Sequence, residues 1–317
     1  MVKTRIFFTT DIHGSEICFL KFVNAGKFYG ASAMILGGDI TGKMIVPLVE
    51  SSDGSYKTNF MGIDRTLKSK EEVEKIEKRI RDTGYYPYHT TQPEMDDLNS
   101  SPDKVDKLFS KLMNETLQRW LGIVEEKLKG TGIKCYILPG NDDRHEIDEI
   151  LEKSEYAINP EGKVVEIDPH HEMISSGYAN MTPWNCPRDV EENELKTRLE
   201  AMTAQVKNMQ NAIFCLHCPP YGTELDMAPK LDEDLRPMVT RGGIVTVHVG
   251  SQAVREAIEK SQPLLGLHGH IHESKGAFKI GRTQCLNAGS EYSELILRGI
   301  LIDLHEKGYN DYLFTSG

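Results

Sequence analysis

Seven side chains that can bind metal ions follow five short apolar segments of the sequence. These segments cover residues 5–10, 33–36, 134–138, 212–216 and 264–267. The side chains that follow them are Asp11, His13, Asp39, Asn141, His217, His270 and His272. Taken singly, each motif has a plain structural reading, such as a capping aspartate or asparagine at a helix start or a surface histidine. Their recurrence after all five segments makes a shared chemical role the better interpretation.

The donors of this set are carboxylate and amide oxygens and imidazole nitrogens, with no thiolate among them. Such an inventory is typical of a two-metal site, in which one carboxylate bridges ions roughly 3.5 to 4 Å apart. Mixed nitrogen and oxygen ligation favours Mn, Fe or Zn over Mg or Ca, which prefer oxygen alone. We therefore predict two divalent transition-metal ions (Mn, Fe or Zn) as cofactors.

The apolar segments alternate along the chain with helical patterns, and this alternation predicts an α/β protein built on a layered sheet. Helical patterns cover residues 15–27, 147–154 and 252–260, and the carboxyl ends of the strands are where such sheets bind ligands. From 276 to 315 consecutive strands with turns replace this alternation, which indicates an antiparallel part of the sheet.

About 90 residues, at about 43–131, interrupt the rhythm, because a simple strand–helix–strand unit needs only roughly 30 residues. We expect a charged helix over 70–81, a Tyr/Pro loop over 85–89 and a long helix over 103–129 with an apolar stripe. A helical hairpin packed on the sheet is the favoured interpretation, with a lid or a dimer contact as alternatives. A further charged helix is expected over 191–211.

In chain order, the motifs resemble those of the calcineurin-like metallophosphoesterase family. They read Asp11-Ile12-His13, Gly38-Asp39, Gly140-Asn141-Asp142-Asp143, His217 and Gly269-His270-Ile271-His272, and Asn287-Ala288-Gly289-Ser290 resembles the family's C-terminal turn. The resemblance covers the chain outside the insertion. It implies an α/β fold, a four-layer α/β/β/α sandwich of mixed sheets, forming a single domain over residues 1–317 with a largely helical insertion.

The resemblance also implies how the metals are held and what they do. One ion would be held by Asp11, His13, Asp39 and His272, and the other by Asp39, Asn141, His217 and His270, with Asp39 as the bridge. The implied activity is metal-dependent hydrolysis of phosphoester bonds, in which a bridging hydroxide attacks phosphorus in line. Asn141 and the helix N-terminus after it would stabilise the charge of the transition state.

Asp142 is a departure from the family, which usually has a histidine after the Gly-Asn pair. A carboxylate beside two metal ions is a poor proton donor, although it can orient water or contact a metal. We therefore expect either a leaving group that needs little protonation or another acid, with His145 and His89 as candidates. Arg144 is a candidate substrate-binding residue, and a helix-surface ion pair is the equal alternative.

Three readings of the function follow. A phosphodiester or nucleotide-type substrate is favoured because the usual acid is missing, and a phosphomonoesterase or a protein phosphatase is the alternative. A non-catalytic, protein-binding scaffold is less favoured, since all seven ligand positions are filled. A protein phosphatase would need arginines beside both the second and third strand motifs, and only Arg144 is present there.

Composition limits the partners. The 317 residues carry a formal charge of −11, which disfavours an extensive nucleic-acid surface and leaves a small phosphorylated substrate. No apolar run is long enough to span a membrane, and the N-terminus lacks a signal-peptide pattern, so we expect a cytoplasmic protein with no membrane partner. The six cysteines, including the Cys215/Cys218 pair, are expected to be reduced core thiols, and His268 to be structural. The oligomeric state is left open.

Overall fold

The computed structural model describes residues 4–317 and contains two large mixed sheets that lie face to face. The first sheet has the strand order β21-β20-β1-β2-β7, in which β1, β2 and β7 are parallel and β20 and β21 antiparallel. Its strands are β1 (Thr4–Thr9), β2 (Ala33–Gly37), β7 (Lys134–Leu138), β20 (Arg298–His305) and β21 (Gly308–Ser316).

The second sheet has the order β18-β19-β17-β12-β9-β8, with a parallel centre and an antiparallel strand at each edge. Its strands are β8 (Val164–Asp168), β9 (His171–Ser176), β12 (Ile213–Leu216), β17 (Leu265–His268), β18 (Gly276–Ile280) and β19 (Thr283–Asn287). The consecutive strands expected from 276 onward are present. They divide between the two sheets, since β18 and β19 belong to the second and β20 and β21 to the first.

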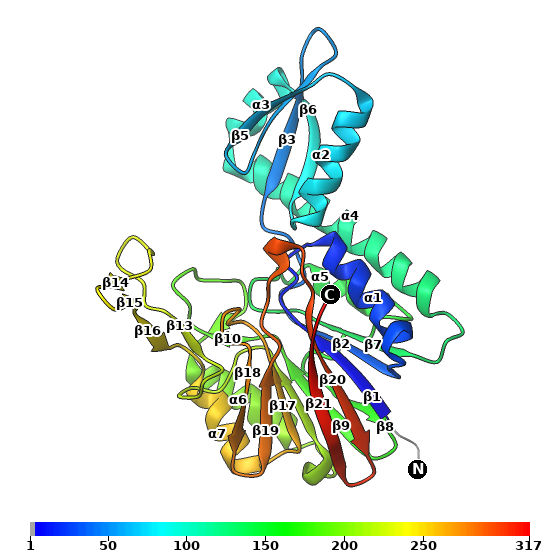
Figure 1. The fold of residues 1–317 in the computed structure, drawn as a ribbon, viewed down its shortest axis with the longest axis vertical. Helices are drawn as coiled ribbons and strands as arrows, with labels where there is room; N and C mark the ends of the chain where they lie inside the picture. The colour runs from blue at the N-terminus through cyan, green and yellow to red at the C-terminus, as the bar shows by residue number, and fades with distance from the viewer. Residues whose placement is uncertain (1–3) are drawn as a thin grey trace.

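Helices cover the outer face of each sheet, so the layers run α/β/β/α as predicted (Figure 1). The first sheet is covered by α1 (Glu16–Tyr29), α4 (Pro102–Leu128) and α5 (Ile147–Glu152), the second by α6 (Glu192–Thr203) and α7 (Gln252–Ser261). Strand alternation separates the cores: Phe7 packs under the helices, whereas Ile6 and Phe8 pack between the sheets. The expected helix over 191–211 ends at Thr203, and a 3-10 turn (Met209–Asn211) follows.

The insertion leaves the first sheet after β2 and stands above the carboxyl ends of the strands (Figure 1). Its helices, α2 (Lys70–Asp82), α3 (Gln92–Asn99) and α4, account for most of its regular structure, as predicted. It also contains a four-stranded sheet, in the order β5-β4-β3-β6, that the sequence analysis missed. These strands are β3 (Ile45–Glu50), β4 (Tyr56–Phe60), β5 (Ile63–Leu67) and β6 (Tyr86–Thr91).

The prediction of a Tyr/Pro loop over 85–89 is wrong, because β6 occupies most of this range. Pro87 is compatible with this strand since β6 lies at the edge of its sheet. The favoured helical hairpin is also incomplete as a description, because only α4 packs on the large sheet. There its Trp120 stacks on Phe19 of α1 with ring centroids 4.1 Å apart. The four-stranded sheet and α2 enclose a separate apolar cluster around Leu48 and Ile80.

A second projection, here called the arm, covers residues 227–248 between β12 and α7. It contains β13 (Met227–Pro229), β14 (Val239–Thr240), β15 (Gly243–Ile244) and β16 (Thr246–His248). The short strands β10 (Ala179–Asn180) and β11 (Asp189–Val190) and a 3-10 turn (Tyr292–Glu294) complete the described elements. Among residues 4–317, no helix is long and apolar enough to cross a membrane.

Candidate metal centre

The loops that follow β1, β2, β7, β12 and β17 meet at one edge of the sandwich and bring the seven predicted residues together. Four of these residues have left-handed backbone conformations, with φ of 53° at Asp11, 40° at His13, 50° at Asp39 and 66° at His270. Non-glycine residues adopt this region at a cost of about 1–3 kcal/mol each, and such strain concentrates at functional sites. The loops are therefore shaped to aim these side chains inward.

One group of ligand atoms consists of Asp11, His13 and His272, whose donor atoms all lie within 4.8 Å of one another. Nε2 of His13 and Nε2 of His272 are 3.0 Å apart, and Nε2 of His272 is 3.4 Å from Oδ1 of Asp11. Asp11 is 1% exposed and His13 2%. Two imidazole nitrogens and a carboxylate that converge in this way can hold one metal ion.

A second group consists of Asp39, His217 and His270, again with donor atoms within 4.8 Å of one another. Nε2 of His217 lies 3.5 Å from Oδ1 of Asp39. Oδ1 of Asn141 lies 2.9 Å from Nδ1 of His270, so the amide oxygen joins this group. The other oxygen of Asp39, Oδ2, lies 3.6 Å from Nε2 of His13 in the first group. Asp39 thus stands between the two groups, as a bridging ligand would.

Unpartnered buried nitrogens show that the site fits metal ions. Nε2 of His217 and Nδ1 of His13 are buried and have no hydrogen-bond partner. The nitrogen of His217 instead faces the carboxylates of Asp39 and Asp11, at 3.5 and 3.8 Å. A buried polar atom without a partner is costly, so a cation between these groups would satisfy them together. The donor set suits Mn, Fe or Zn, whose identity and number in the protein stay predictions.

Glycines allow the loops to approach this closely. At Gly38, with φ of 118°, a Cβ atom would lie 2.2 Å from Nδ1 of His217. At Gly140 it would lie 2.1 Å from Oδ1 of Asp39, and at Gly269 2.4 Å from Oδ2 of Asp11. Distances under 3.0 Å are incompatible with a side chain, so these three positions require glycine.

Burial and the charges of neighbouring side chains shift the pKa values of the candidate ligands in opposite directions. Burial lowers the pKa of His217, but Asp39 and Asp11 outweigh it and raise that pKa to about 10. Burial also favours a protonated Asp39, yet the charge of His217 holds the pKa of this carboxyl well below its ordinary value. Burial and the charge of His217 lower the pKa of His270 to about 4, and burial lowers that of His13 to about 3. The carboxylates are therefore anionic, and positive charge accumulates beside them.

The residues after Asn141 divide into different roles. Asp142 lies at the edge of the first group, with Oδ2 3.8 Å from Nδ1 of His13, while its backbone N–H donates to Oδ1 of Asp39. Asp143 is fully buried and accepts hydrogen bonds from the backbone N–H groups of Ile40, Thr41 and Gly140. It thereby ties the loop after β2 to the loop after β7.

The three other candidate residues, Arg144, His145 and His89, pair with groups outside the set of seven candidate metal ligands. The Arg144 guanidinium donates to Asp106 and Ser110 of α4, at 2.7 and 2.9 Å, which is the ion pair considered as its alternative. His145 is exposed, and its Nε2 lies 3.0 Å from the carbonyl oxygen of Pro187. His89 pairs with Glu77 within the insertion. Their catalytic roles gain no support from these contacts.

Three residues at the site were not found by sequence reasoning. Asp189 accepts a hydrogen bond of 2.9 Å from Nδ2 of Asn141 and so orients the amide. Lys43 forms a 2.9 Å ion pair with Asp142. The Tyr292 ring lies 4.8 Å from the ring of His13, between centroids. No motif marks any of them: Lys43 lies in a loop, Asp189 begins the two-residue strand β11 and Tyr292 begins a 3-10 turn, and the position of each depends on the tertiary fold.

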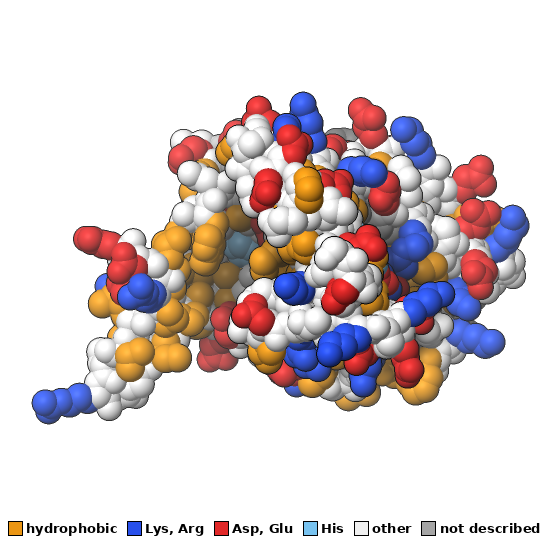
Figure 2. All heavy atoms as spheres, turned by 90° about the horizontal axis from the view of Figure 1, so that it is seen from above, with side chains coloured by type: hydrophobic (Ala, Val, Ile, Leu, Met, Phe, Trp, Pro, Cys, Tyr) orange, Lys and Arg blue, Asp and Glu red, His pale blue; other side chains and the backbone are white. Residues whose placement is uncertain are grey.

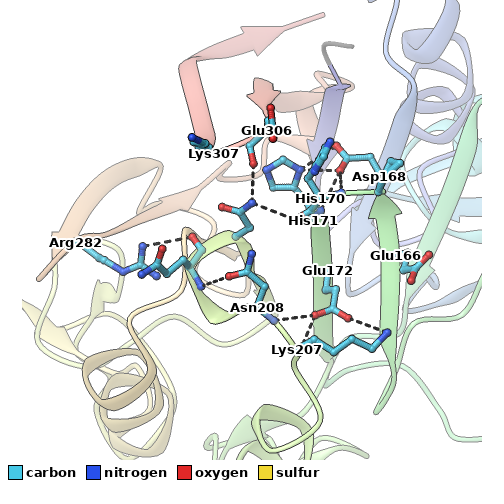
Figure 3. Close-up of a pocket in the computed structure, with 13 residues that line it drawn as sticks. Glu166, Asp168, His170, His171, Glu172, Lys207, Asn208, Arg282, Glu306 and Lys307 are labelled. Carbon is cyan, nitrogen blue, oxygen red and sulfur yellow. Dashed lines mark hydrogen bonds and ion pairs between the residues drawn. The ribbon is translucent and has the colours of Figure 1, made fainter. Parts of the chain in front are cut away.

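A separate pocket lies around the start of β9 (Figure 3). It has a volume of about 600 Å³ and is lined by His170 and His171 together with charged residues such as Lys207 and Glu306. His171 begins β9 and Ser176 ends it, so five residue steps put His171 roughly 17 Å from the carboxyl end of this strand, the end toward the candidate metal centre.

His268 and five of the six cysteines are buried as expected, whereas Cys186 is half-buried and lies near Asp142. His268 is buried, and its Nδ1 lies 2.8 Å from the carbonyl oxygen of Leu216. All six cysteines among the described residues are free, and Cys215 and Cys218 are buried in two different apolar clusters. These residues support the packing of the second sheet.

The chain folds as a four-layer α/β/β/α sandwich with these five loops at one edge, which is the fold that its resemblance to the calcineurin-like metallophosphoesterases implied. No family model matches the sequence. The uncharacterized protein MJ1162 of Methanocaldococcus jannaschii is 34% identical over 152 residues, which are 47% of this chain and 61% of that protein. The chain thus spans less than two thirds of the length of this relative.

Solved structures align over nearly the whole chain. TT1561 of Thermus thermophilus is 14% identical, covers 100% of this chain and 99% of its own, and has a TM-score of 0.53. YfcE, a phosphoesterase from E. coli, is 10% identical, covers 98% of each chain and has a TM-score of 0.34. The similarity to TT1561 is one of fold.

Proposed function

We propose that the protein is a metal-dependent hydrolase of phosphoester bonds that works with two metal ions. The observation that carries this proposal is the position of Asp39, whose Oδ1 and Oδ2 face His217 and His13 at 3.5 and 3.6 Å. A carboxylate shared by two converging ligand groups is the arrangement needed for a dinuclear site. Two ions held there would act as Lewis acids on the phosphoryl group and would lower the pKa of water for attack.

The residues of the chain would bind and orient the substrate around this pair. Nδ2 of Asn141 is held by Asp189, so the amide oxygen is fixed toward His270 and the second group. The backbone N–H of Asp142 donates to Asp39 and fixes the bridging carboxylate. Such preorganisation lowers the cost of reaching the transition state because the groups need not move during the reaction.

We propose a phosphodiester or nucleotide-type compound as the substrate. Asp142 replaces the usual acidic histidine, which favours a leaving group that needs little protonation. Figure 2 shows a hollow beside the arm, with histidine visible at its floor and apolar side chains along the arm. Val239 and Ile244 of the arm are 70% and 58% exposed.

A phosphomonoesterase or protein phosphatase is the second candidate. It is less favoured because the guanidinium of Arg144 donates hydrogen bonds to Ser110 and Asp106 of α4, away from the two groups of candidate metal ligands. A protein-binding scaffold is disfavoured by the complete and converging ligand set. The cytoplasm remains the proposed compartment.

The decisive experiment combines metal analysis with hydrolysis assays. The purified protein is analysed for bound elements and then assayed with an aryl phosphate diester and the matching monoester in added Mn²⁺, Zn²⁺ or Fe²⁺. We expect bound transition metal and turnover that favours the diester. Absence of both metal and turnover would refute the enzyme reading, and a strong preference for the monoester would select the second candidate.

A further inference from the structure

Lys43 brings a positive charge from the insertion to the edge of the candidate metal centre. It lies four residues after Asp39, in the segment that leads from β2 into β3. Its Nζ is 2.9 Å from Oδ2 of Asp142, and the same Oδ2 is 3.8 Å from Nδ1 of His13. The ammonium group therefore stands one carboxylate away from the first group of metal-binding atoms.

Asp142 occupies the position after the Gly-Asn pair, where the resembling family usually has histidine. A histidine there would bring a donor to the substrate, whereas a carboxylate brings only acceptors. Because Lys43 is paired with this carboxylate, the chain recovers a donor at the same place. The side chain of Lys43 is 46% exposed, so one face of the ammonium is open to a ligand in solvent.

The charge of Lys43 reaches several groups of the site. Burial lowers the pKa of Lys43, but Asp142 and Asp39 outweigh burial and raise it above its ordinary value. In turn, Lys43 contributes to lowering the pKa of His13, after burial and against the opposing effect of Asp39. Lys43 is thus a permanent cation near neutral pH, placed close to where negative phosphoryl oxygens would lie.

We propose that Lys43, positioned by Asp142, binds the phosphoryl oxygens of the substrate and substitutes for the missing histidine at this centre. This inference rests on the proposed function and adds to it a substrate-binding residue contributed by the insertion. The ammonium has three N–H donors, and the pairing with Asp142 leaves two of them for phosphoryl oxygens. Asp142 is then a positioning residue, since it acts through the lysine.

A lysine at this position does not protonate the leaving group. Lys43 stabilises negative charge while keeping its own proton, so the departing oxygen takes the bonding electron pair and leaves as an anion. Water supplies the oxygen of the new bond to phosphorus, and its proton passes to solvent. Esters with acidic leaving groups should therefore react much faster than alkyl esters.

The test compares Lys43→Met, Lys43→Arg and Asp142→Asn with the wild type and with Lys57→Met. Lys57 is an exposed lysine of β4 that forms no ion pair with any of the described residues. Lys57→Met therefore removes the same charge at a different place in the insertion. Binding of inorganic phosphate to the Mn²⁺-loaded proteins is measured by titration calorimetry, with bound Mn²⁺ and melting temperature determined for each. The values of kcat/KM are measured for aryl phosphodiesters of graded leaving-group acidity.

We expect Lys43→Met to weaken phosphate binding by ~10-fold or more at unchanged Mn²⁺ content, because a charge-assisted hydrogen bond is lost. Lys43→Arg should retain most of the binding, Asp142→Asn should lose part of it, and Lys57→Met should match the wild type. The kcat/KM of Lys43→Met should fall most for the least acidic leaving group, where most negative charge develops.

Two outcomes would overturn the inference. One is a Lys43→Met variant that keeps its Mn²⁺ and binds phosphate as tightly as the wild type. The other is loss of Mn²⁺ in Asp142→Asn with normal phosphate binding in Lys43→Met, which would make Asp142 a metal ligand beside His13 and Asp39. Failure of the proposed function is distinguishable, since the wild-type protein would then hydrolyse neither the aryl phosphate diester nor the aryl phosphate monoester.

Discussion

Oδ1 of Asn141 lies 2.9 Å from Nδ1 of His270, although the two residues are 129 positions apart and lie in loops that follow strands of different sheets. Asn141 follows β7 of the first sheet, and His270 follows β17 of the second. The second ligand group therefore exists only when the two sheets are packed together. Binding of metal should for this reason stabilise the whole sandwich, because the unfolded chain holds no such group.

Replacing Asp39 by asparagine should disturb both metal positions. The variant keeps the shape of the side chain but loses the negative charge between the two groups. We expect Mn²⁺ affinity and kcat/KM to fall by ~10²-fold or more, since even outer contacts of metal ligands contribute 10–100-fold. Elemental analysis and steady-state kinetics measure the effect. Asp234→Asn on the exposed arm is the control, and equal metal content in the two variants would contradict the prediction.

Gly38→Ala should act on the site by displacing the ring of His217. The new Cβ would lie 2.2 Å from Nδ1 of His217, so the imidazole must move away from the second group. Gly54→Ala is a matched control, because Gly54 also has positive φ (79°) but nothing within 4 Å of the added atom. Both variants should lose about 1 kcal/mol of stability from the backbone. Only Gly38→Ala should weaken Mn²⁺ binding, by ~10-fold or more; equal binding in both would show that the contact is unimportant.

Metal binding should strengthen as pH rises. Against the opposing effect of burial, Asp39 and Asp11 raise the pKa of His217 to about 10, so its imidazole holds a proton at neutral pH until a metal displaces it. A metal ion that binds to His217 displaces this proton, so the apparent Mn²⁺ affinity of the second group should increase between pH 6 and pH 8.5. At a concentration 100 times the Kd, Mn²⁺ should add about 2.7 kcal/mol to the free energy of unfolding. Thermal denaturation with Mn²⁺ and with EDTA at both pH values measures this, and a larger metal effect at pH 6 would be the contrary result.

The convergence of the seven candidate ligands could be predicted from the sequence because they follow directly the ends of apolar strands. The strands at 5–10 and 33–36 are short, continuous and buried, and polar residues mark where each stops. Two parallel neighbours such as β1 and β2 must place Asp11 and Asp39 at the same edge. His217 after β12, and His270 and His272 after β17, could be predicted from their motifs in the same way.

Other features depended on contacts that no local pattern shows. The small sheet of the insertion was missed because β4 and β5 are short and mostly exposed, and because Pro87 within β6 is typical of a loop. Its core forms only when Leu48 and Ile80 meet across the insertion. Lys43 was missed for a similar reason, since its role depends on a pairing with Asp142 about 100 positions away.

Glu161 provides a prediction about stability that is independent of metal. Its carboxylate accepts a hydrogen bond of 2.6 Å from the backbone N–H of Gly177, yet burial raises its pKa to about 7. Between pH 4.5 and pH 7 the folded state therefore binds a proton that the unfolded state has released. The free energy of unfolding should fall as pH rises through this interval and become level above it.

Glu161→Gln removes this titration while keeping an acceptor for Gly177. In EDTA, the variant should gain roughly 1–3 kcal/mol relative to the wild type between pH 5 and pH 8. Glu149→Gln, at an exposed position of α5, makes the same charge change and should show no such trend. Urea denaturation at several pH values gives the free energies of unfolding. A difference between Glu161→Gln and the wild type that stays constant from pH 5 to pH 8 would mean that Glu161 titrates at its ordinary pKa in the folded protein.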